Sequence, residues 1–356
     1  MKKYRILHVT REFSDLIVGG IEQSVMLAAG NIRQSHQVLA LGHPGEAPES
    51  NCHGFSVFRV FPRGSLKFFP WSLQWFRLLG QLAQTADVIH LHSPFPLGEL
   101  SVFGCQRPVV CTYHSDIVGY GWIGRLYSFV QKRMIQRSAA VVVTSPSYVE
   151  SSNSLGSFSK KLYVVPFGLP MESVDPEPPK VRMPPRFFLF LGSDRRYKGL
   201  SVLLEAYRLT GFPIVFAGVV RPENLFETNF EQVFWLGSVT ESEKSWLLKH
   251  ADALILPSVS RAESFGIVLL EAMRLGRPCI CTSLGTGTDW VVVDQHTGLV
   301  VDPNNPSQLA DAMRCIYLDG DLRKQMGLAG RARFEREFGL TGYHQKLSSV
   351  YQRVLV

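Results

Sequence analysis

The chain has 356 residues, of which 46% are hydrophobic and 19% are charged, a globular composition in a chain long enough for two domains. No apolar run approaches the roughly eighteen residues that a membrane-spanning helix needs, and the start of the chain enters a strand-like pattern with no secretory signal. The net charge of +7 is confined to residues 1–170, which carry 16 Lys or Arg against 9 Asp or Glu, whereas the remainder carries 21 of each.

The basic half favours an anionic partner, either membrane phospholipid or nucleic acid, although surface charge that serves only solubility explains it equally well. The cysteines form no CxxC pair and have no zinc-site spacing, which indicates free thiols in a reducing compartment. They are Cys52, Cys105, Cys111, Cys279, Cys281 and Cys315.

In the first half, short apolar runs alternate with helical patterns. After the run at 5–10 comes a glycine-bearing loop and a helix to about residue 33, and further strand candidates follow at 37–42, 87–93, 108–115, 140–146 and 161–168. This alternation predicts a parallel sheet with helices on both faces. Gly19 and Gly20 follow the first strand, where ligands often meet such a sheet, but a lone pair of glycines is more often a plain turn. Neither a GxGxxG nor a GxxxxGK[ST] motif occurs, so a nicotinamide or P-loop site is not supported.

Two segments interleave aromatic and basic residues at helical spacing. The first, between Arg63 and Arg77, carries Lys67, Phe68, Phe69, Trp71, Trp75 and Phe76; the second, from Tyr120 to Arg137, carries Trp122, Arg125, Tyr127, Phe129, Lys132 and Arg133. Such helices suit a lipid interface, and the alternative is that the aromatic residues belong to the core. No recognised nucleic-acid motif accompanies the charge, so we expect no nucleic-acid partner.

His114 stands at the end of a predicted strand, in TYHSD, with Asp116 close by in the sequence. A histidine at the mouth of a parallel sheet can contact a ligand hydroxyl or a developing charge. The alternative is a histidine that is hydrogen-bonded only locally.

The stretch from residue 170 to 185 is rich in proline and lacks periodicity, which predicts a linker. The second half restarts with a strand at 186–193, and the loop GSDRRYKG at 192–199 carries cations placed to neutralise a diphosphate. Strand candidates at 214–219, 233–238, 253–258, 279–283 and 298–303 continue the alternation, and amphipathic helices run from about 306 to 355.

Residues 260–276, SRAESFGIVLLEAMRLG, contain two glutamates, Glu263 and Glu271, eight positions apart. The pattern predicts a loop and then a helix beginning near Phe265, whose first-turn N–H groups suit a phosphate. Glu271 would lie roughly 9 Å along the axis at about 1.5 Å per residue. One carboxylate could then hold a sugar hydroxyl beyond a diphosphate, unless both are ordinary surface glutamates.

Five motifs follow one another in a fixed order: GGIEQ at 19–23, TYHSD at 112–116, Lys198-Gly199, the E-x7-E of Glu263 and Glu271, and GTGT at 285–288. In this order they resemble glycosyltransferase family 4, and the resemblance covers essentially the whole chain. It implies a GT-B fold, an α/β architecture of two Rossmann-like domains that face each other across a cleft. The expected domains are residues 1–170, a linker at 171–185, a nucleotide-sugar domain at 186–340 and a C-terminal helix at 341–356 that packs back toward the first domain.

The resemblance also implies a role for each matching residue. Lys198 would bind the donor diphosphate, whose distal phosphate would meet the N–H groups around Phe265, Gly266 and Ile267. Arg195 would replace the arginine that family members carry where Ser193 stands here, and Arg196 remains an alternative. Gly19 and Gly20 would let the first loop approach the diphosphate.

The remaining roles concern the sugar and the ribose. Glu263 and His114 are the predicted catalytic residues and would contact the transferred sugar, while Glu271 would bind the ribose. Thr286, Gly287 and Thr288 are further candidates for donor contact. No cofactor and no metal are expected, because the only D-x-D, at 319–321, falls in a predicted turn between helices.

The stretches YKGL, GTGT and YHSD resemble the bacterial mannosyl- and D-rhamnosyltransferases of surface-polysaccharide assembly, such as O-antigen synthesis. This implies a retaining, metal-independent transfer of mannose or D-rhamnose from a GDP-sugar to a lipid-linked glycan or lipopolysaccharide. It also implies a cytoplasmic protein, peripheral at the inner face of the inner membrane. The alternatives are a UDP-sugar donor, a nucleotide-sugar 2-epimerase, and a non-catalytic nucleotide-sugar-binding protein of the same fold.

Overall fold

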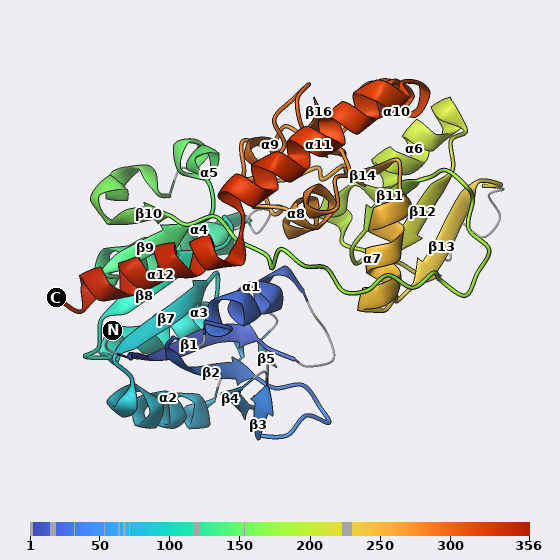
Figure 1. The fold of residues 1–356 in the computed structure, drawn as a ribbon. Coiled ribbons are helices and arrows are strands. Elements are labelled where there is room, and N and C mark those ends of the chain that lie inside the picture. The colour runs from blue at the N-terminus through green and yellow to red at the C-terminus, as the bar shows by residue number, and fades with distance from the viewer. Residues whose placement is uncertain are drawn as a thin grey trace. The chain divides into compact units, whose positions relative to one another are not determined.

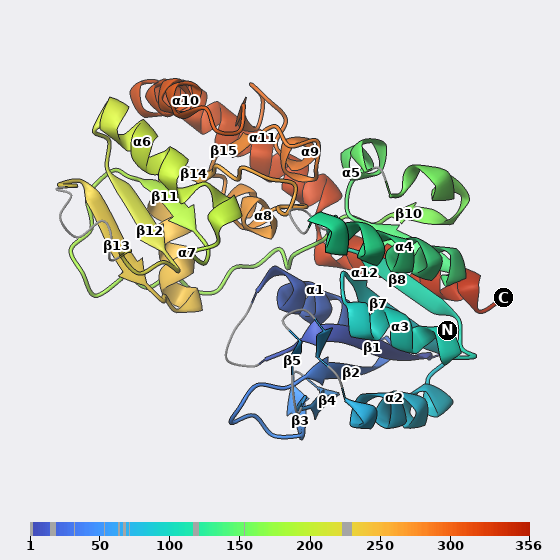
Figure 2. The same cartoon turned by 180° about the vertical axis from the view of Figure 1, so that it is seen from behind.

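The computed structural model describes residues 3–356 except 15–18, 32, 53, 63–64, 67–68, 71, 117–120, 153 and 223–229. The chain divides into two compact units, Met1–Phe167 with Thr341–Val356 (unit 1) and Gly168–Leu340 (unit 2). Each unit contains one largely parallel sheet with helices on both faces (Figures 1 and 2). This confirms the α/β class predicted from the alternation of apolar runs. No helix in the described part of the chain is long and apolar enough to cross a bilayer.

Unit 1 is built on an eight-stranded sheet in the order β10-β9-β8-β7-β1-β2-β4-β3, parallel except for β3. Its strands are β1 (Arg5–Glu12), β2 (Ser35–Leu41), β3 (Glu49–Cys52), β4 (Phe55–Val60), β7 (Val88–Ser93), β8 (Val109–Tyr113), β9 (Ala140–Val143) and β10 (Leu162–Val164). Its helices are α1 (Gly20–Ala29), α2 (Leu73–Thr85), α3 (Pro96–Ser101), α4 (Gly121–Arg137), α5 (Pro146–Ser151) and α12 (Leu340–Val354). Two short 3-10 helices, Val102–Gly104 and Gly156–Lys161, and a separate pair β5 (Ser65–Leu66) and β6 (Phe69–Pro70) complete it. The strands between β2 and β7 were not predicted from the sequence.

The two faces of this sheet differ in chemistry. Odd-numbered residues of β1, such as Leu7 and Val9, join a large apolar core with Trp75, Leu79 and neighbouring residues of α2 to α5. The even-numbered face is covered by α1 and α12 (Figures 1 and 2) and carries a row of buried histidines. The C-terminal helix therefore covers polar groups, and its Tyr351 hydroxyl lies 2.7 Å from His90 Nδ1.

Unit 2 has a six-stranded, fully parallel sheet in the order β13-β12-β11-β14-β15-β16. Its strands are β11 (Phe188–Leu191), β12 (Ile214–Ala217), β13 (Val233–Gly237), β14 (Ala253–Leu256), β15 (Cys279–Thr282) and β16 (Gly298–Val301). Its helices are α6 (Leu200–Thr210), α7 (Glu241–His250), α8 (Ile267–Arg274), α9 (Thr288–Val291), α10 (Pro306–Leu318) and α11 (Gly320–Glu337), with a 3-10 turn at Arg196–Lys198. The four inner strands β11, β12, β14 and β15 are almost completely buried and are mainly apolar, as is typical of parallel strands between two layers of helices.

Residues 171–185, predicted as a linker, contain no helix or strand but are bound to unit 2. The Ser245 hydroxyl donates to the Val174 carbonyl at 2.7 Å, and the Arg274 guanidinium donates to the carbonyls of Pro170 and Glu172. This segment thus runs along α7 and α8 rather than hanging free.

The aromatic-basic segments of unit 1 only partly match the predicted interface helices. Trp75 is fully buried and its indole N–H donates to Ser101 Oγ at 3.1 Å, so this residue belongs to the core and not to a lipid-facing surface. Phe129 is 58% exposed, with the Arg133 guanidinium over its ring. Lys67, Phe68, Trp71 and Tyr120 lie outside the described residues, as do the side chains of Phe69, Trp122 and Arg125.

Candidate functional site

The sheet of unit 2 reverses its direction of winding between β11 and β14. From β11 the chain proceeds to β12 and β13 on one side, and from β14 to β15 and β16 on the other. In open α/β sheets, ligands bind where the loops at the carboxyl ends of two such strands separate. The two loops here, 192–199 and 257–266, lie side by side, and the Val259 N–H donates to the Tyr197 carbonyl at 2.7 Å.

Two glycines shape the loop that carries Lys198. Gly192 has φ 148°, and a Cβ added there would lie 2.5 Å from the Lys198 ammonium, so the lysine side chain passes directly over this glycine. Gly199, at φ 71°, caps α6 and abuts the Pro257 carbonyl so closely that a Cβ would collide with it. Both glycines are therefore required by the geometry of the loop. Gly199 lets the loop turn back, and Gly192 leaves room for the Lys198 side chain that passes over it.

Glu263 lies beside this lysine. Desolvation raises the pKa of the half-buried Glu263 carboxyl above its ordinary value, while the Lys198 charge and the Gly266 N–H hydrogen bond act in the opposite direction. The Lys198 ammonium, the Glu263 carboxylate and the residue that caps α8 therefore converge at one place. A cation, a carboxyl group and a helix N-terminus at a switch point can bind an anionic group attached to a polyol.

Helix α8 differs in detail from the expected helix. It begins at Ile267, two residues after Phe265, because Gly266 adopts the left-handed conformation (φ 75°) that places it outside the helix. The Phe265 side chain is buried and packs edge-on against Phe338, so only its backbone can face a ligand. The Gly266 N–H already binds the Glu263 carboxylate, and the first-turn N–H groups that follow carry the positive end of the helix.

The GTGT loop at 285–288 is hydrogen-bonded to the loop that carries Glu263. The Thr286 hydroxyl donates to the Glu263 carbonyl at 2.9 Å, the Gly287 N–H donates to the Ser264 carbonyl, and the Thr286 and Thr288 hydroxyls bond to each other. Both threonine side chains are fully buried. Their side chains thus hold the loop in place, which leaves only its backbone available for the predicted donor contact.

Glu271 faces α7 and is buried. Its carboxylate lies 3.0 Å from the Lys244 ammonium, which also binds Glu241 at 2.7 Å. Burial opposes the charge of Lys244, but the two carboxylates outweigh it and raise the lysine pKa. The sequence analysis did not single out Lys244, since a lysine 27 positions away gives no local signal.

Two arginines follow each other in the Lys198 loop, and one of them is distinguished by its neighbours. Burial and the Glu263 charge raise the pKa of Tyr197 to about 12, and the Arg195 charge acts against this rise. Arg195 is therefore electrostatically coupled to Tyr197 next to Glu263, although its side chain is exposed.

In unit 1 the winding reverses between β1 and β7. Gly19 and Gly20 stand after β1, where Gly19 caps α1 and Gly20 is exposed. His114 follows β8; its backbone N–H donates to the Ser93 carbonyl, and the residue is 5% exposed. The Asp116 carboxylate accepts hydrogen bonds from the hydroxyl groups of Tyr113, at 2.7 Å, and Ser152, at 2.9 Å.

The partner of His114 is another histidine, which the sequence analysis missed. His92 Nδ1 lies 2.9 Å from His114 Nε2, His92 Nε2 lies 3.1 Å from His8 Nδ1, and His8 Nε2 lies 3.0 Å from His36 Nδ1. The signal was present in the strands, since His8 and His90 are register partners and Ile6 pairs with His36, so these rings share one face of the sheet.

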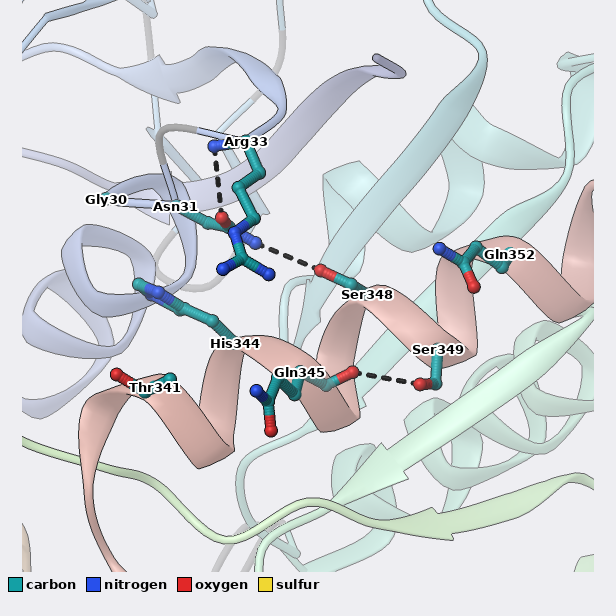
Figure 3. A pocket seen from close by; sticks show the side chains of 9 residues that line it. All are labelled: Gly30, Asn31, Arg33, Thr341, His344, Gln345, Ser348, Ser349 and Gln352. Carbon is teal, nitrogen blue, oxygen red and sulfur yellow. Dashed lines mark hydrogen bonds between the residues drawn. The ribbon is translucent and has the colours of Figure 1, made fainter. Parts of the chain in front are cut away.

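A polar pocket of about 310 Å³ lies elsewhere in unit 1, along α12 (Figure 3). It contains none of the residues predicted to bind a donor. Its lining comes from the end of α1 and from α12: Gly30, Asn31, Arg33, Thr341, His344, Gln345, Ser348, Ser349 and Gln352.

The D-x-D at 319–321 caps a helix. Asp319 Oδ1 accepts the Leu322 N–H at 2.9 Å as the N-cap of α11, which fits the predicted turn.

Both units match known protein families. A family model described as glycosyltransferase family 4 matches residues 18–173, and one described as glycosyl transferases group 1 matches residues 173–333. D-rhamnosyltransferase WbpZ of Pseudomonas aeruginosa is 33% identical, with 94% of this chain and 92% of that protein covered. O-antigen chain mannosyltransferase C of Escherichia coli is 32% identical, with 94% of each chain covered.

Solved structures show the same fold at lower identity. Sucrose-phosphate synthase from Thermosynechococcus elongatus superposes with a TM-score of 0.81 at 18% identity, covering 99% of both chains. HepE from Anabaena, solved with UDP and glucose, superposes with a TM-score of 0.79 at 16% identity, covering 98% of this chain and 99% of that one. The prediction of two Rossmann-like domains of the GT-B class is confirmed.

Proposed function

Because this chain belongs to glycosyltransferase family 4, we propose that it transfers mannose or D-rhamnose from a GDP-sugar to a growing surface polysaccharide such as O-antigen. The sugar class rests on the names of the two relatives that match over almost the whole chain, a D-rhamnosyltransferase and an O-antigen mannosyltransferase. A UDP-sugar is the second candidate, since HepE, of the same fold, was solved with UDP.

The convergence of Lys198, Glu263 and the start of α8 at the unit 2 switch point carries this proposal. The physical demand of the reaction is to stabilise a departing nucleoside diphosphate as negative charge grows on it. Lys198, Arg195 and the N-terminus of α8 supply positive charge there without a metal ion. If these groups alone stabilise the charge on the departing diphosphate, no metal ion is needed and a chelator leaves the rate of sugar transfer unchanged.

Glu263 and His114 are assigned to the transferred hexose. The raised pKa of Glu263 suits a carboxyl group that exchanges hydrogen bonds with sugar hydroxyls close to a diphosphate. Glu271, held by Lys244 at 3.0 Å, is assigned to the ribose hydroxyls, for which a fixed carboxylate is a good acceptor. We propose retention at the anomeric carbon, in which the acceptor attacks from the face that the diphosphate leaves.

A donor panel tests the proposal. The purified chain is incubated with GDP-mannose, GDP-D-rhamnose, UDP-glucose and UDP-galactose together with a lipid-linked glycan, with EDTA in parallel, and the product anomer is assigned by NMR. We expect transfer only from the GDP-sugars, with the donor's anomeric configuration retained and no effect of EDTA. Transfer from UDP-sugars alone contradicts the donor assignment. Sugar isomerisation without transfer contradicts the transferase mechanism.

We further propose that the acceptor is lipid-linked and that unit 1 therefore touches an anionic membrane during the reaction. The exposed ring of Phe129 under the Arg133 guanidinium, beside the exposed Lys132, supports this contact. Co-sedimentation with phosphatidylglycerol vesicles at low salt tests it. Replacing Phe129 and Arg133 by serine should abolish sedimentation, and binding that persists in this variant contradicts the surface chosen.

A further inference from the structure

A chain of four histidines connects His114 to the carbonyl of Asn31. It runs from the Asn31 oxygen to His36, His8, His92 and finally His114, and each ring contacts the next through one nitrogen at 2.9–3.1 Å. Its first contact, from His36 Nε2 to the Asn31 oxygen, is 3.2 Å. The rings come from β2, β1, β7 and the residue after β8, so the chain crosses the sheet from strand to strand.

The carbonyl at one end fixes the direction of every hydrogen bond in the chain. A carbonyl oxygen only accepts, so His36 must carry its proton on Nε2. A neutral imidazole has one proton, hence His36 Nδ1 is an acceptor and must receive the proton of His8 Nε2. The same step repeated twice puts the proton of His92 on Nε2 and that of His114 on Nε2 as well.

Burial keeps these rings neutral. Desolvation lowers the pKa of His36 and of His114 to about 4, and it lowers the pKa of His8 and His92 well below the ordinary value. The Asn31 end is held in place too, since the Asn31 amide donates to Ser348 Oγ at 3.0 Å and its Oδ1 accepts the Arg33 N–H (Figure 3).

We infer that His36, His8 and His92 are positioning residues, which force His114 into one tautomer so that its Nδ1 presents a lone pair to a hydroxyl group of the ligand. No described residue forms a hydrogen bond with His114 Nδ1, so this atom is left for the ligand. Accepting a hydrogen bond from a hydroxyl orients a sugar without placing positive charge beside it. The benefit to transfer rests on the proposed contact between His114 and the hexose, whereas the tautomer itself does not.

A metal ion is the competing use of the same face. His8, His90 and His92 have ring nitrogens within 4.8 Å of one another. However, both His90 nitrogens are engaged, with Tyr351 at 2.7 Å and the Thr112 hydroxyl at 2.6 Å, and both His8 nitrogens belong to the chain. Binding a metal would break these hydrogen bonds, so the arrangement favours the neutral chain.

The test reads the tautomer directly. The full-length protein is labelled with 15N-histidine, and long-range 1H–15N spectra assign the protonated nitrogen of His114 in the wild type and in two variants. His36→Phe removes the directing contact three links away from His114. His90→Phe removes another buried histidine of the same face, one that lies outside the chain of hydrogen bonds.

We expect the proton of His114 on Nε2 in the wild type and in His90→Phe, and a mixture of tautomers in His36→Phe. In transfer assays, kcat/KM of His36→Phe should fall about 10- to 100-fold, the range seen when partners that orient metal-ligating histidines are removed. His90→Phe should keep the wild-type preference of the enzyme among donors that each lack one hydroxyl group, whereas His36→Phe should lose part of it. If His36→Phe fails to fold, His8→Phe takes its place, since it interrupts the chain one link later.

Several outcomes overturn the inference. A proton on His114 Nδ1 in the wild type contradicts the proposed tautomer. A His114 tautomer that stays fixed in His36→Phe shows that the chain of histidines does not set it. Stoichiometric metal found by elemental analysis of the purified protein removes it as well. Unchanged kinetics in His36→Phe remove the positioning role, while a wild-type protein that transfers no sugar from any donor overturns the proposed function and leaves the tautomer result standing.

Discussion

Lys198 shows how much one side chain depends on its immediate backbone. Its ammonium lies over Gly192 because that residue has no Cβ, and its approach to Glu263 requires the left-handed Gly199 that follows it. The lysine therefore occupies its position before any ligand binds. A cation held in this way stabilises a leaving group without the cost of reorganisation at the moment of reaction.

Replacing Lys198 by methionine should lower kcat by about 100-fold or more, the loss typical of removing one preorganised electrostatic contact to a developing charge. The change keeps the length and apolar body of the side chain, so the melting temperature should move little. The matched control is Lys324→Met, which removes an exposed cation of α11 in the same unit. Equal losses in both variants contradict a specific role for Lys198.

Lys244 should contribute to stability through Glu271. In Lys244→Met the Glu271 carboxylate, 8% exposed, loses its ammonium partner, and we expect the free energy of unfolding to fall by about 2–3 kcal/mol. The double variant with Glu271→Gln should regain most of this loss, because no unpaired charge is then buried. Urea denaturation of the three variants measures the coupling, and strictly additive losses contradict it.

At the scale of elements, the position of α8 is set by its contact with α11. Gly327 of α11 lies against the Gly276 carbonyl at the end of α8, and a Cβ at Gly327 would collide with that oxygen. The absence of one side chain thus allows the closest approach of the two helices. The start of α8, which carries the candidate phosphate site, is indirectly positioned by this contact.

Gly327→Ala should destabilise the protein by about 1–3 kcal/mol, because the overpacking outweighs the helix propensity of alanine, worth about 1 kcal/mol. The control is Gly80→Ala on the exposed face of α2, where an added Cβ meets nothing within 4 Å. That variant should be stabilised by up to about 1 kcal/mol. Thermal unfolding distinguishes the two, and a stabilised Gly327→Ala shows that α11 tolerates a wider contact.

At the scale of the whole molecule, the buried histidines on one face of the unit 1 sheet make the free energy of unfolding depend on pH. Desolvation lowers the pKa of His36 to about 4, with the charges of His344 on α12 and of Lys3 acting in the same direction. Burial likewise lowers the pKa of His90 to about 3 and of His114 to about 4. These rings are neutral in the folded chain but take up protons near pH 6.5 once it unfolds.

The free energy of unfolding should therefore be largest above pH 6.5 and should fall as the pH drops from 6.5 toward 4. Between these values the unfolded chain binds more protons, and each extra proton contributes a slope of about 1.4 kcal/mol per pH unit. Denaturant titrations from pH 7.5 to 5 measure this slope. His90→Phe should reduce the slope by up to the contribution of one proton, whereas His296→Gln, a change at an exposed site, should leave the slope unchanged. A free energy of unfolding that does not change with pH contradicts the neutral state of the buried histidines.

The fold class and the family of this protein could be predicted from its sequence. The alternation of apolar runs predicted two parallel α/β sheets, and five short motifs predicted the GT-B fold and the transferase family, because glycines with special backbone angles and helix starts leave a local signature. The motifs also singled out Lys198 and Glu263, but only the folded chain shows that the Lys198 charge acts on the Glu263 carboxyl. The start of α8 was misplaced by two residues, since the left-handed Gly266 is read only from its φ angle.

Contacts between distant strands were decided by the tertiary structure alone. The link of Lys244 to Glu271 and the row from His36 to His114 join residues that lie far apart in the sequence. Trp75, for which the sequence left a lipid interface and the core as alternatives, fills the core. Periodicity tells which residues share a face of one strand or helix. Only the register between strands brings separate faces together, and the function of a histidine depends on which neighbour its nitrogen meets.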